Sequence, residues 1–200
     1  MKKLLTLWML TLLPFCLSAQ NDAKAAEVLD QALTHLSGSS GIRADFQGTE
    51  NGFLLLKGEK FYLNNGNIQS WYDGKTQWLY TTATEEVNML EPTEEELQMS
   101  NPYMIIMGYN RNFTSQLMSS RGSHYIMRLN AKNTAAEISQ VELTVDKLSY
   151  RIVKAIFMLS DGVKQEIKFS NYNINKKITD GEFVFDAKLV PAGTSVIDIR

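Results

Sequence analysis

Short apolar segments joined by tight-turn signals run through most of this chain of 200 residues. They constrain its fold more than any other feature. Asn64-Asn65-Gly66 and Asp73-Gly74 each separate two such segments, and both end in the Asn-Gly or Asp-Gly pair that favours a two-residue hairpin turn. Because turns this short join only antiparallel neighbours, we expect an antiparallel sheet of about eleven strands. The expected strands are residues 44–46, 53–56, 61–63, 68–72, 77–80, 86–90, 124–129, 141–145, 152–159, 163–169 and 183–185, followed by an extended tail at 196–197.

Helical patterns interrupt the strands at two places. Residues 21–37 carry alanines and leucines at three- and four-residue steps, with Asp22 as the expected N-cap. A second helical region, residues 92–122, begins with Pro92 and an acidic turn, restarts at Asn101-Pro102, and is expected to hold a third helix over 112–120. One face of the sheet must be covered, and these helices are the available covers.

The first 19 residues read as a secretory signal peptide. Lys2 and Lys3 precede an apolar run over residues 4–15, and Ala19 offers a small residue at the cleavage point. The expected organisation is therefore a signal peptide over 1–19 and one domain over 20–200, exported to the periplasm as a soluble protein.

Cys16 is the only cysteine and leaves with the signal peptide. The alternative is that Cys16 is lipidated and anchors the protein. The bulky Phe15 directly before it fits that pattern badly.

No catalytic or metal-binding arrangement is evident. The chain has no Gly-x-Ser-x-Gly elbow, and its two histidines, His35 and His124, lie far apart without a neighbouring cysteine. Glu94, Glu95 and Glu96 are consecutive, so they fan around a helix instead of converging. The formal net charge of −2 gives no support for a nucleic-acid binder. We therefore expect a protein that is not an enzyme and has no metal and no catalytic residues.

Methionines gather in the helical region. Met99, Met104, Met107 and Met118 all lie there, and methionine is frequent at adaptable apolar binding surfaces. Ordinary core packing is the alternative explanation.

Five blocks in a fixed order resemble one known family. They are residues 41–46 (GIRADF), 57–63 (KGEKFYL), 73–80 (DGKTQWLY), 101–106 (NPYMII), and the ending from 183–186 (FVFD) to 196–198 (VID). With them the chain is similar to the periplasmic outer-membrane lipoprotein carriers (LolA-like), in the form found in Bacteroidetes-type bacteria.

The resemblance implies a mainly β (α+β) fold, an unclosed antiparallel β-barrel with a lid of three α-helices. It implies that acylated lipoproteins bind with their acyl chains between barrel and lid. The carrier would accept them from an inner-membrane lipoprotein-releasing transporter and deliver them to an outer-membrane acceptor or the membrane surface, without a cofactor. Two alternatives with the same fold stay open, namely an acceptor anchored to the outer membrane and a lipid-binding periplasmic sensor.

The resemblance also suggests individual roles. Tyr103, Met104 and Ile106 match lid positions that touch the cavity, and Leu63 stands where proteobacterial carriers have a cavity tryptophan. Lys57 stands where they have an arginine that latches the lid, so it is the candidate latch. With the apolar strand and helix faces added, the candidate lipid-binding residues are Leu29, Leu33, Leu36, Phe46, Phe61, Leu63, Trp71, Trp78, Tyr80, Met89, Tyr103, Met104, Ile106, Met107, Phe113, Leu117, Met127, Leu143 and Ile156.

Overall fold

The computed structural model describes residues 13–200, which form one curved sheet of twelve strands with helices on one of its faces. Strand order across the sheet is β12-β6-β5-β4-β3-β2-β1-β11-β10-β9-β8-β7. The strands are β1 (Ile42–Gln47), β2 (Asn51–Lys57), β3 (Lys60–Asn64), β4 (Ile68–Tyr72), β5 (Gln77–Thr81), β6 (Glu86–Leu90), β7 (Phe113–Ser119), β8 (His124–Ala131), β9 (Ile138–Asp146), β10 (Ile152–Leu159), β11 (Lys164–Ile174) and β12 (Ser195–Asp198).

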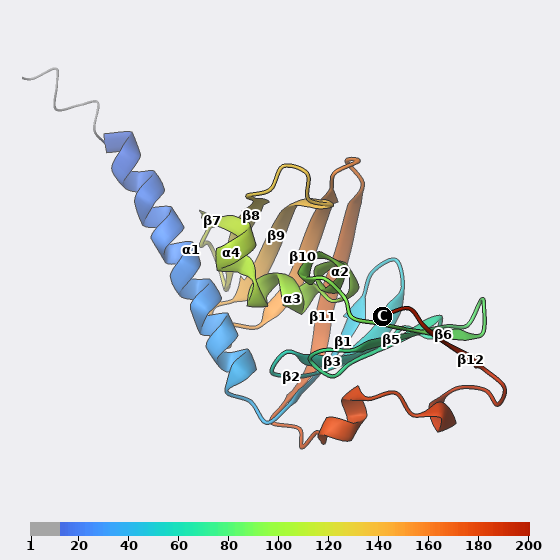
Figure 1. Cartoon of the computed structure of the whole chain (residues 1–200). Helices are drawn as coiled ribbons and strands as arrows, with labels where there is room; N and C mark the ends of the chain where they lie inside the picture. Colours follow the sequence, from blue (N-terminus) through green and yellow to red (C-terminus); the bar gives the residue numbers. More distant parts are fainter. Residues whose placement is uncertain (1–12) are drawn as a thin grey trace, which may run out of the picture.

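The sheet is open, with β7 and β12 at its two edges. All neighbours are antiparallel except β12, which pairs with β6 in parallel. The helices are α1 (Leu13–Ser37), α2 (Glu94–Ser100), α3 (Pro102–Met107) and α4 (Tyr109–Asn112). Figure 1 shows α2, α3 and α4 in the angle between the β7–β11 half and the β1–β6 half of the sheet. These three helices are called the lid below. The architecture confirms the expected unclosed antiparallel barrel with a helical lid.

Alternating residues divide each strand between two faces, and on the β2–β6 half the outer face is apolar as well as the inner one. The inner face, toward the lid, carries fully buried side chains such as Ala44, Phe61 and Val141, which join α1 and the lid in the main core. The outer face carries a separate cluster around Trp71 and Val87. A sheet that is apolar on both faces needs a cover on both sides.

Residues 175–200, the C-terminal segment, provide the outer cover. Phe183 is fully buried beside Leu55, and the ring of Phe185 lies edge-on to Trp71 with 5.4 Å between centroids. The prediction of a strand over 183–185 is wrong, because Phe183 ends the short 3-10 helix η1 (Asp180–Phe183) and the next two residues continue without pairing to the sheet. After η2 (Ala187–Leu189), the expected extended tail becomes β12.

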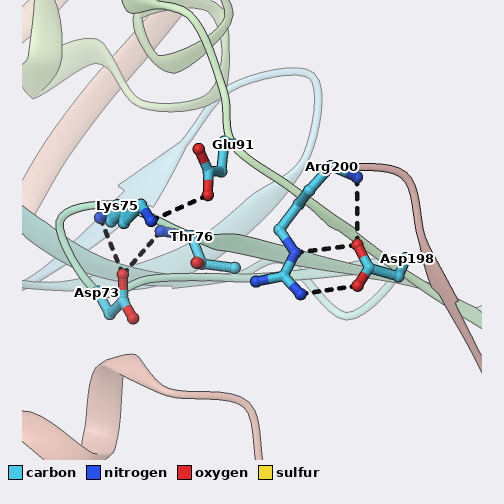
Figure 2. A network of polar contacts seen from close by, with 6 residues as sticks. All are labelled: Asp73, Lys75, Thr76, Glu91, Asp198 and Arg200. Atoms are coloured by element: carbon cyan, nitrogen blue, oxygen red, sulfur yellow. Dashed lines mark hydrogen bonds and ion pairs between the residues drawn. The ribbon is translucent and has the colours of Figure 1, made fainter.

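Polar contacts hold the turn before β5 and the end of the chain in place (Figure 2). One carboxylate oxygen of Asp73 accepts hydrogen bonds from the backbone N–H of Lys75 at 2.9 Å and of Thr76 at 2.8 Å, which stabilises the Asp-Gly hairpin that the sequence predicts. At the terminus the guanidinium of Arg200 donates to both carboxylate oxygens of Asp198, at 2.9 and 2.7 Å, and these bonds lower the pKa of Asp198 to about 2.

The N-terminal helix begins earlier than expected. Helix α1 runs from Leu13 to Ser37, so Asp22 lies inside it and is not an N-cap. The reason is that Pro14 lies in the first turn, where proline is tolerated, and residues 15–21 include Ala19 and Gln20, good helix formers, without a further Pro or a Gly. Most of the expected signal peptide, residues 1–12, lies outside the described residues. Within residues 13–200, no helix combines the length and apolar character needed to cross a bilayer.

The prediction of a third helix, over 112–120, is also wrong. The lid ends with the single turn α4, and the chain continues as the edge strand β7, where Leu117 pairs with Met127 of β8. Phe113 and Leu117 are four residues apart, a spacing that places two side chains on the same face of a helix and also of a strand. The stretch becomes a strand and not a helix because it pairs with the free edge of β8.

Candidate functional site

A cavity of about 540 Å³ lies between α2 and the inner face of the sheet. This volume falls within the range of small-molecule sites, about 300–1,000 Å³. Its wall is largely apolar and comes from both halves of the barrel. The apolar lining residues are Phe46, Leu54, Leu63, Ile68, Leu79, Met99, Ile138, Phe157, Leu159, Ile167 and Phe169.

Helix α2 forms one side of the cavity through Gln98, Met99 and Ser100. It begins where the sequence predicts, because Thr93 and Glu96 make a reciprocal capping box. The N–H of Thr93 donates to the Glu96 carboxylate at 2.7 Å, which lowers the pKa of Glu96. Met99 remains 37% exposed, so a flexible apolar side chain stands at the cavity rim.

Helix α3 is set at an angle to α2 by Asn101. Its side-chain oxygen accepts from the N–H of Tyr103 at 3.1 Å, and Pro102 occupies the first helical position, as expected. This turn directs Tyr103, Ile105 and Ile106 into the main core, where each is at most 2% exposed.

A buried polar group joins the lid to the sheet beside the cavity. The amide nitrogen of Gln77 on β5 donates to the Ser70 hydroxyl at 2.9 Å and to the Ser100 hydroxyl of α2 at 3.3 Å. Ser70 and Ser100 both line the cavity. The wall therefore has two hydroxyl groups close together between its apolar side chains.

A second polar contact anchors α3. The Tyr103 and Tyr172 hydroxyls are hydrogen-bonded to each other, and the Tyr172 hydroxyl also donates to the Ile152 carbonyl. Burial raises the pKa of both tyrosines, so both hydroxyls stay protonated. The ring of Tyr103 packs edge-on against Phe169 with 5.3 Å between centroids. Tyr103 therefore fastens the lid to β11, next to the cavity wall.

We expect Tyr103→Phe to loosen the lid without unfolding the barrel. The substitution keeps the aromatic packing but leaves the buried Tyr172 hydroxyl with one partner fewer, so the free energy of unfolding should fall by about 1–2 kcal/mol. Hydrogen exchange of residues 101–108 should accelerate more than that of β9. Tyr125→Phe, on a half-buried ring outside this contact, is the control. Equal acceleration in lid and sheet would contradict a role in fastening the lid.

Helix α4 is attached to α1 by a side-chain hydrogen bond. The Tyr109 hydroxyl donates to the Asp30 carboxylate at 2.7 Å, and burial together with this bond raises the pKa of Tyr109. At the other end of the lid, the Glu95 carboxylate accepts the backbone N–H of Glu137 at 2.7 Å. The lid is thus held by α1, β5, β11 and the loop before β9.

Most of the candidate residues lie on the inner side of the molecule, in the main core or the partly buried shell around it, where α1, the lid and the sheet meet. They are Leu29, Leu33, Leu36, Phe46, Phe61, Leu63, Tyr103, Met104, Ile106, Phe113, Leu117, Met127 and Leu143. Phe46 and Leu63 also line the cavity. The remaining lid candidate, Met107, is half-buried on α3. Contact with lipid stays a prediction for all of them.

Five candidates are on the outer face, so the expectation that they face the lid is wrong. Trp71, Trp78 and Tyr80 pack under the C-terminal segment. Met89 pairs with Trp78, and Ile156 pairs with Glu142 and Glu166. Both faces of β4 and β5 are apolar, so periodicity could not tell which face is the inner one.

Lys57 does not reach the lid in this structure. Its ammonium donates to the Ile178 carbonyl at 3.1 Å and to the Asp180 carboxylate at 2.9 Å, and Lys60 pairs with the same carboxylate at 3.1 Å. Lys57 lies on the outer face of β2, two residues after Leu55 on that face, and fastens the C-terminal segment. The reason is strand alternation, since Leu54 and Leu56 occupy the inner face.

We expect Asp180→Asn to free the C-terminal segment and leave the lid unaffected. The two lysines lower the pKa of Asp180, so this contact is present above the ordinary carboxyl pKa and is lost as pH falls through the lowered value. The protection of the amides of residues 178–185 against hydrogen exchange, taken relative to the intrinsic rate at each pH, should fall in the variant at neutral pH and in the native protein in acid. Asp161→Asn, at an exposed turn, is the control; faster exchange in the lid would contradict this assignment.

Residues that the sequence reasoning missed make up most of the cavity wall. Ile167 and Phe169 follow the strand alternation that predicts β11, and Leu79 shares an inner-face row with Ser70. Strand alternation was the signal in the sequence that could have found these residues. It identifies which side chains share the inner face of the sheet, but not where the lid leaves that face uncovered. Within residues 13–200, no three His, Cys, Asp or Glu side chains converge as metal ligands.

The chain is similar to proteins that are already known. The model of a family described as outer membrane lipoprotein carrier protein LolA matches residues 15–161. An outer-membrane lipoprotein carrier protein from Idiomarina loihiensis is 24% identical over 127 residues, which cover 63% of this chain and 58% of that relative. The chain thus spans less than two thirds of the length of the curated relative that it matches.

A solved structure with a TM-score above 0.5 shares the fold. An uncharacterized conserved protein from Thermus thermophilus has a TM-score of 0.60 at 14% identity, over 88% of this chain and 99% of that chain. A LolA-superfamily protein from Nitrosomonas europaea has a TM-score of 0.42 at 12% identity, over 80% of this chain and 97% of that chain.

Proposed function

Because this chain belongs to the outer-membrane lipoprotein carrier family LolA, we propose that it is a periplasmic carrier that holds the acyl chains of lipoproteins in the cavity under its lid. The observation that carries the proposal is the apolar cavity of about 540 Å³ between α2 and the inner face. Its wall is largely built from aliphatic and aromatic side chains, the kind of surface that acyl chains prefer.

The physical need for such a carrier follows from the cost of exposing acyl chains. Each CH₂ group moved into water costs about 0.8 kcal/mol, so a long acyl chain costs on the order of 10 kcal/mol. A carrier has to match much of this free energy when loaded and hide its own apolar surface when empty. The lid packs on the barrel in the present structure and thereby hides that surface.

Movement of the lid would enlarge the cavity for more than one chain. The polar contacts that hold α2 to the barrel are one hydrogen bond from the Gln77 amide to Ser100 and one from the backbone N–H of Glu137 to the Glu95 carboxylate. Met99 lies at the cavity rim and Met104 is half-buried against the core, and their flexible side chains can repack around cargo of irregular shape. Transfer requires reversible binding, and contacts of this kind can break and re-form.

In this proposal the signal peptide directs the chain to the periplasm. The partners are an inner-membrane lipoprotein-releasing transporter as donor and an outer-membrane acceptor or membrane surface as destination. The carrier itself needs no cofactor, because apolar affinity decides both loading and release.

The test is transfer of a triacylated fluorescent lipopeptide between two vesicle populations separated by a dialysis membrane that passes the protein but not vesicles. The purified protein should extract the lipopeptide into a soluble complex of defined mass and accelerate its arrival in the second population. A protein that is folded by circular dichroism but extracts no lipopeptide would overturn the proposal. If the lipopeptide is extracted and transferred, mass spectrometry of lipoproteins that copurify with the protein from the periplasm would identify the natural cargo.

A further inference from the structure

The mouth of the cavity carries a fixed negative charge. Glu50 lies in the turn between β1 and β2, is exposed to solvent, and lines the cavity together with its neighbours Gly48 and Thr49. Asn65, in the turn between β3 and β4, lines the cavity from the adjacent hairpin. Gly48, Thr49 and Glu50 are all exposed, so this turn forms part of the solvent-facing rim of the cavity, called its mouth here, and a ligand with its acyl chains inside would present its polar group beside it.

Neutral amides hold the Glu50 carboxylate in place. One of its oxygens accepts from the Asn67 side-chain amide at 3.0 Å, and the other accepts from the Asn65 side-chain amide. The amide oxygen of Asn65 in turn accepts the backbone N–H groups of Asn67 at 3.1 Å and Ile68 at 2.7 Å. The turn thus orients Asn65, and Asn65 orients the carboxylate.

The charge of Glu50 is not compensated by an ion pair with any residue in 13–200. Glu166, the other acidic residue in the lining, differs in this respect. Its carboxylate pairs with Lys168 at 3.3 Å and Lys154 at 3.8 Å. Glu50 therefore supplies the uncompensated charge at the mouth.

We propose that Glu50 is a specificity-determining residue that selects acyl cargo by the charge of its polar group, rejecting anionic lipids in favour of uncharged diacylglyceryl groups. The inference rests on the proposed function, because it assumes acyl chains in this cavity. In a phospholipid the phosphate follows directly after the acylated glycerol, so it would meet the Glu50 carboxylate at the mouth. A diacylglyceryl group attached to a protein through a thioether has no charge at that position. Like-charge repulsion is an ordinary means of excluding the wrong ligand.

The experiment compares two short-chain lipids with the same acyl chains. Dioctanoylglycerol is uncharged and dioctanoyl phosphatidylglycerol is anionic, and each displaces a fluorescent uncharged diacylglycerol probe from the full chain. The native protein should prefer the uncharged lipid about three- to tenfold at low ionic strength, as expected for one like-charge contact near the surface. The preference should shrink at about 0.5 M NaCl, where such contacts are screened.

Glu50→Gln should bring the two affinities to within about twofold by improving the binding of the anionic lipid. Glu59→Gln makes the same charge change at an exposed turn outside the cavity lining and should keep the native preference. Equal affinities in the native protein, or a preference that survives Glu50→Gln, would overturn the assignment of Glu50 while leaving the carrier proposal intact. Failure of the native protein to bind either lipid or the probe would overturn both.

Discussion

Leu63→Glu should yield a folded protein that no longer takes up acyl chains. Leu63 is partly buried on the inner face of β3, opposite Leu54 and Ser70, and lines the cavity. In the empty protein the new carboxylate can point into the cavity and keep its water. A bound acyl chain would strip that water away without supplying a partner, which costs several kcal/mol. The affinity for an acyl probe should therefore fall by about a hundredfold or more.

Fluorescence titration of the native and variant proteins with a pyrene-labelled fatty acyl ester measures this loss. Leu148→Glu is the matched control, because Leu148 is 93% exposed in the turn after β9 and lies outside the cavity lining. This control should bind as the native protein does. Undiminished uptake by a folded Leu63→Glu protein would place the acyl chains elsewhere.

Ile106→Asp should lower the free energy of unfolding of the whole protein. Ile106 is fully buried in the main core, where α3 packs against the barrel and α1. An aspartate there loses the packing of the isoleucine and places an unpaired polar group in an apolar surrounding. Together these should lower the free energy of unfolding by at least about 4 kcal/mol.

Urea unfolding followed by circular dichroism measures this change. Ile106→Val keeps the shape and apolar character of the site and should cost about 0.5–1.5 kcal/mol. A stable Ile106→Asp protein with the native unfolding midpoint would show that α3 contributes little to the fold. The contrast with Leu63→Glu separates wall positions that face empty space from lid positions that face the core.

The hairpin half of the barrel was predictable because its turns are local. Asn-Asn-Gly and Asp-Gly specify tight turns through backbone conformation, and Figure 2 shows how Asp73 stabilises its own hairpin. The starts of α2 and α3 were predictable for the same reason, since Thr93, Asn101 and Pro102 act within one helical turn. Such signals need no partner that is distant in sequence.

The errors occur where two patterns coincide. Phe113 and Leu117 fit one face of a helix or of a strand, and the free edge of β8 selects the strand. Trp71 and Tyr80 are apolar side chains on strands that are apolar on both faces, and only the C-terminal segment packed over them reveals that they face outward. The resemblance predicts that Lys57 latches the lid, but the alternation of β2 directs its side chain to Asp180.

The sequence by itself determined the antiparallel hairpins, the position of the lid between β6 and β8, and the family of the chain, because turn conformation, helix caps and side-chain periodicity act over a few neighbouring residues. Only the tertiary structure decided which face of the sheet the lid covers, where a cavity is left beneath α2, and that Glu50 lies at its mouth. Those features depend on how strands from both halves of the chain curve toward one another, and packing between residues far apart in sequence sets that curvature.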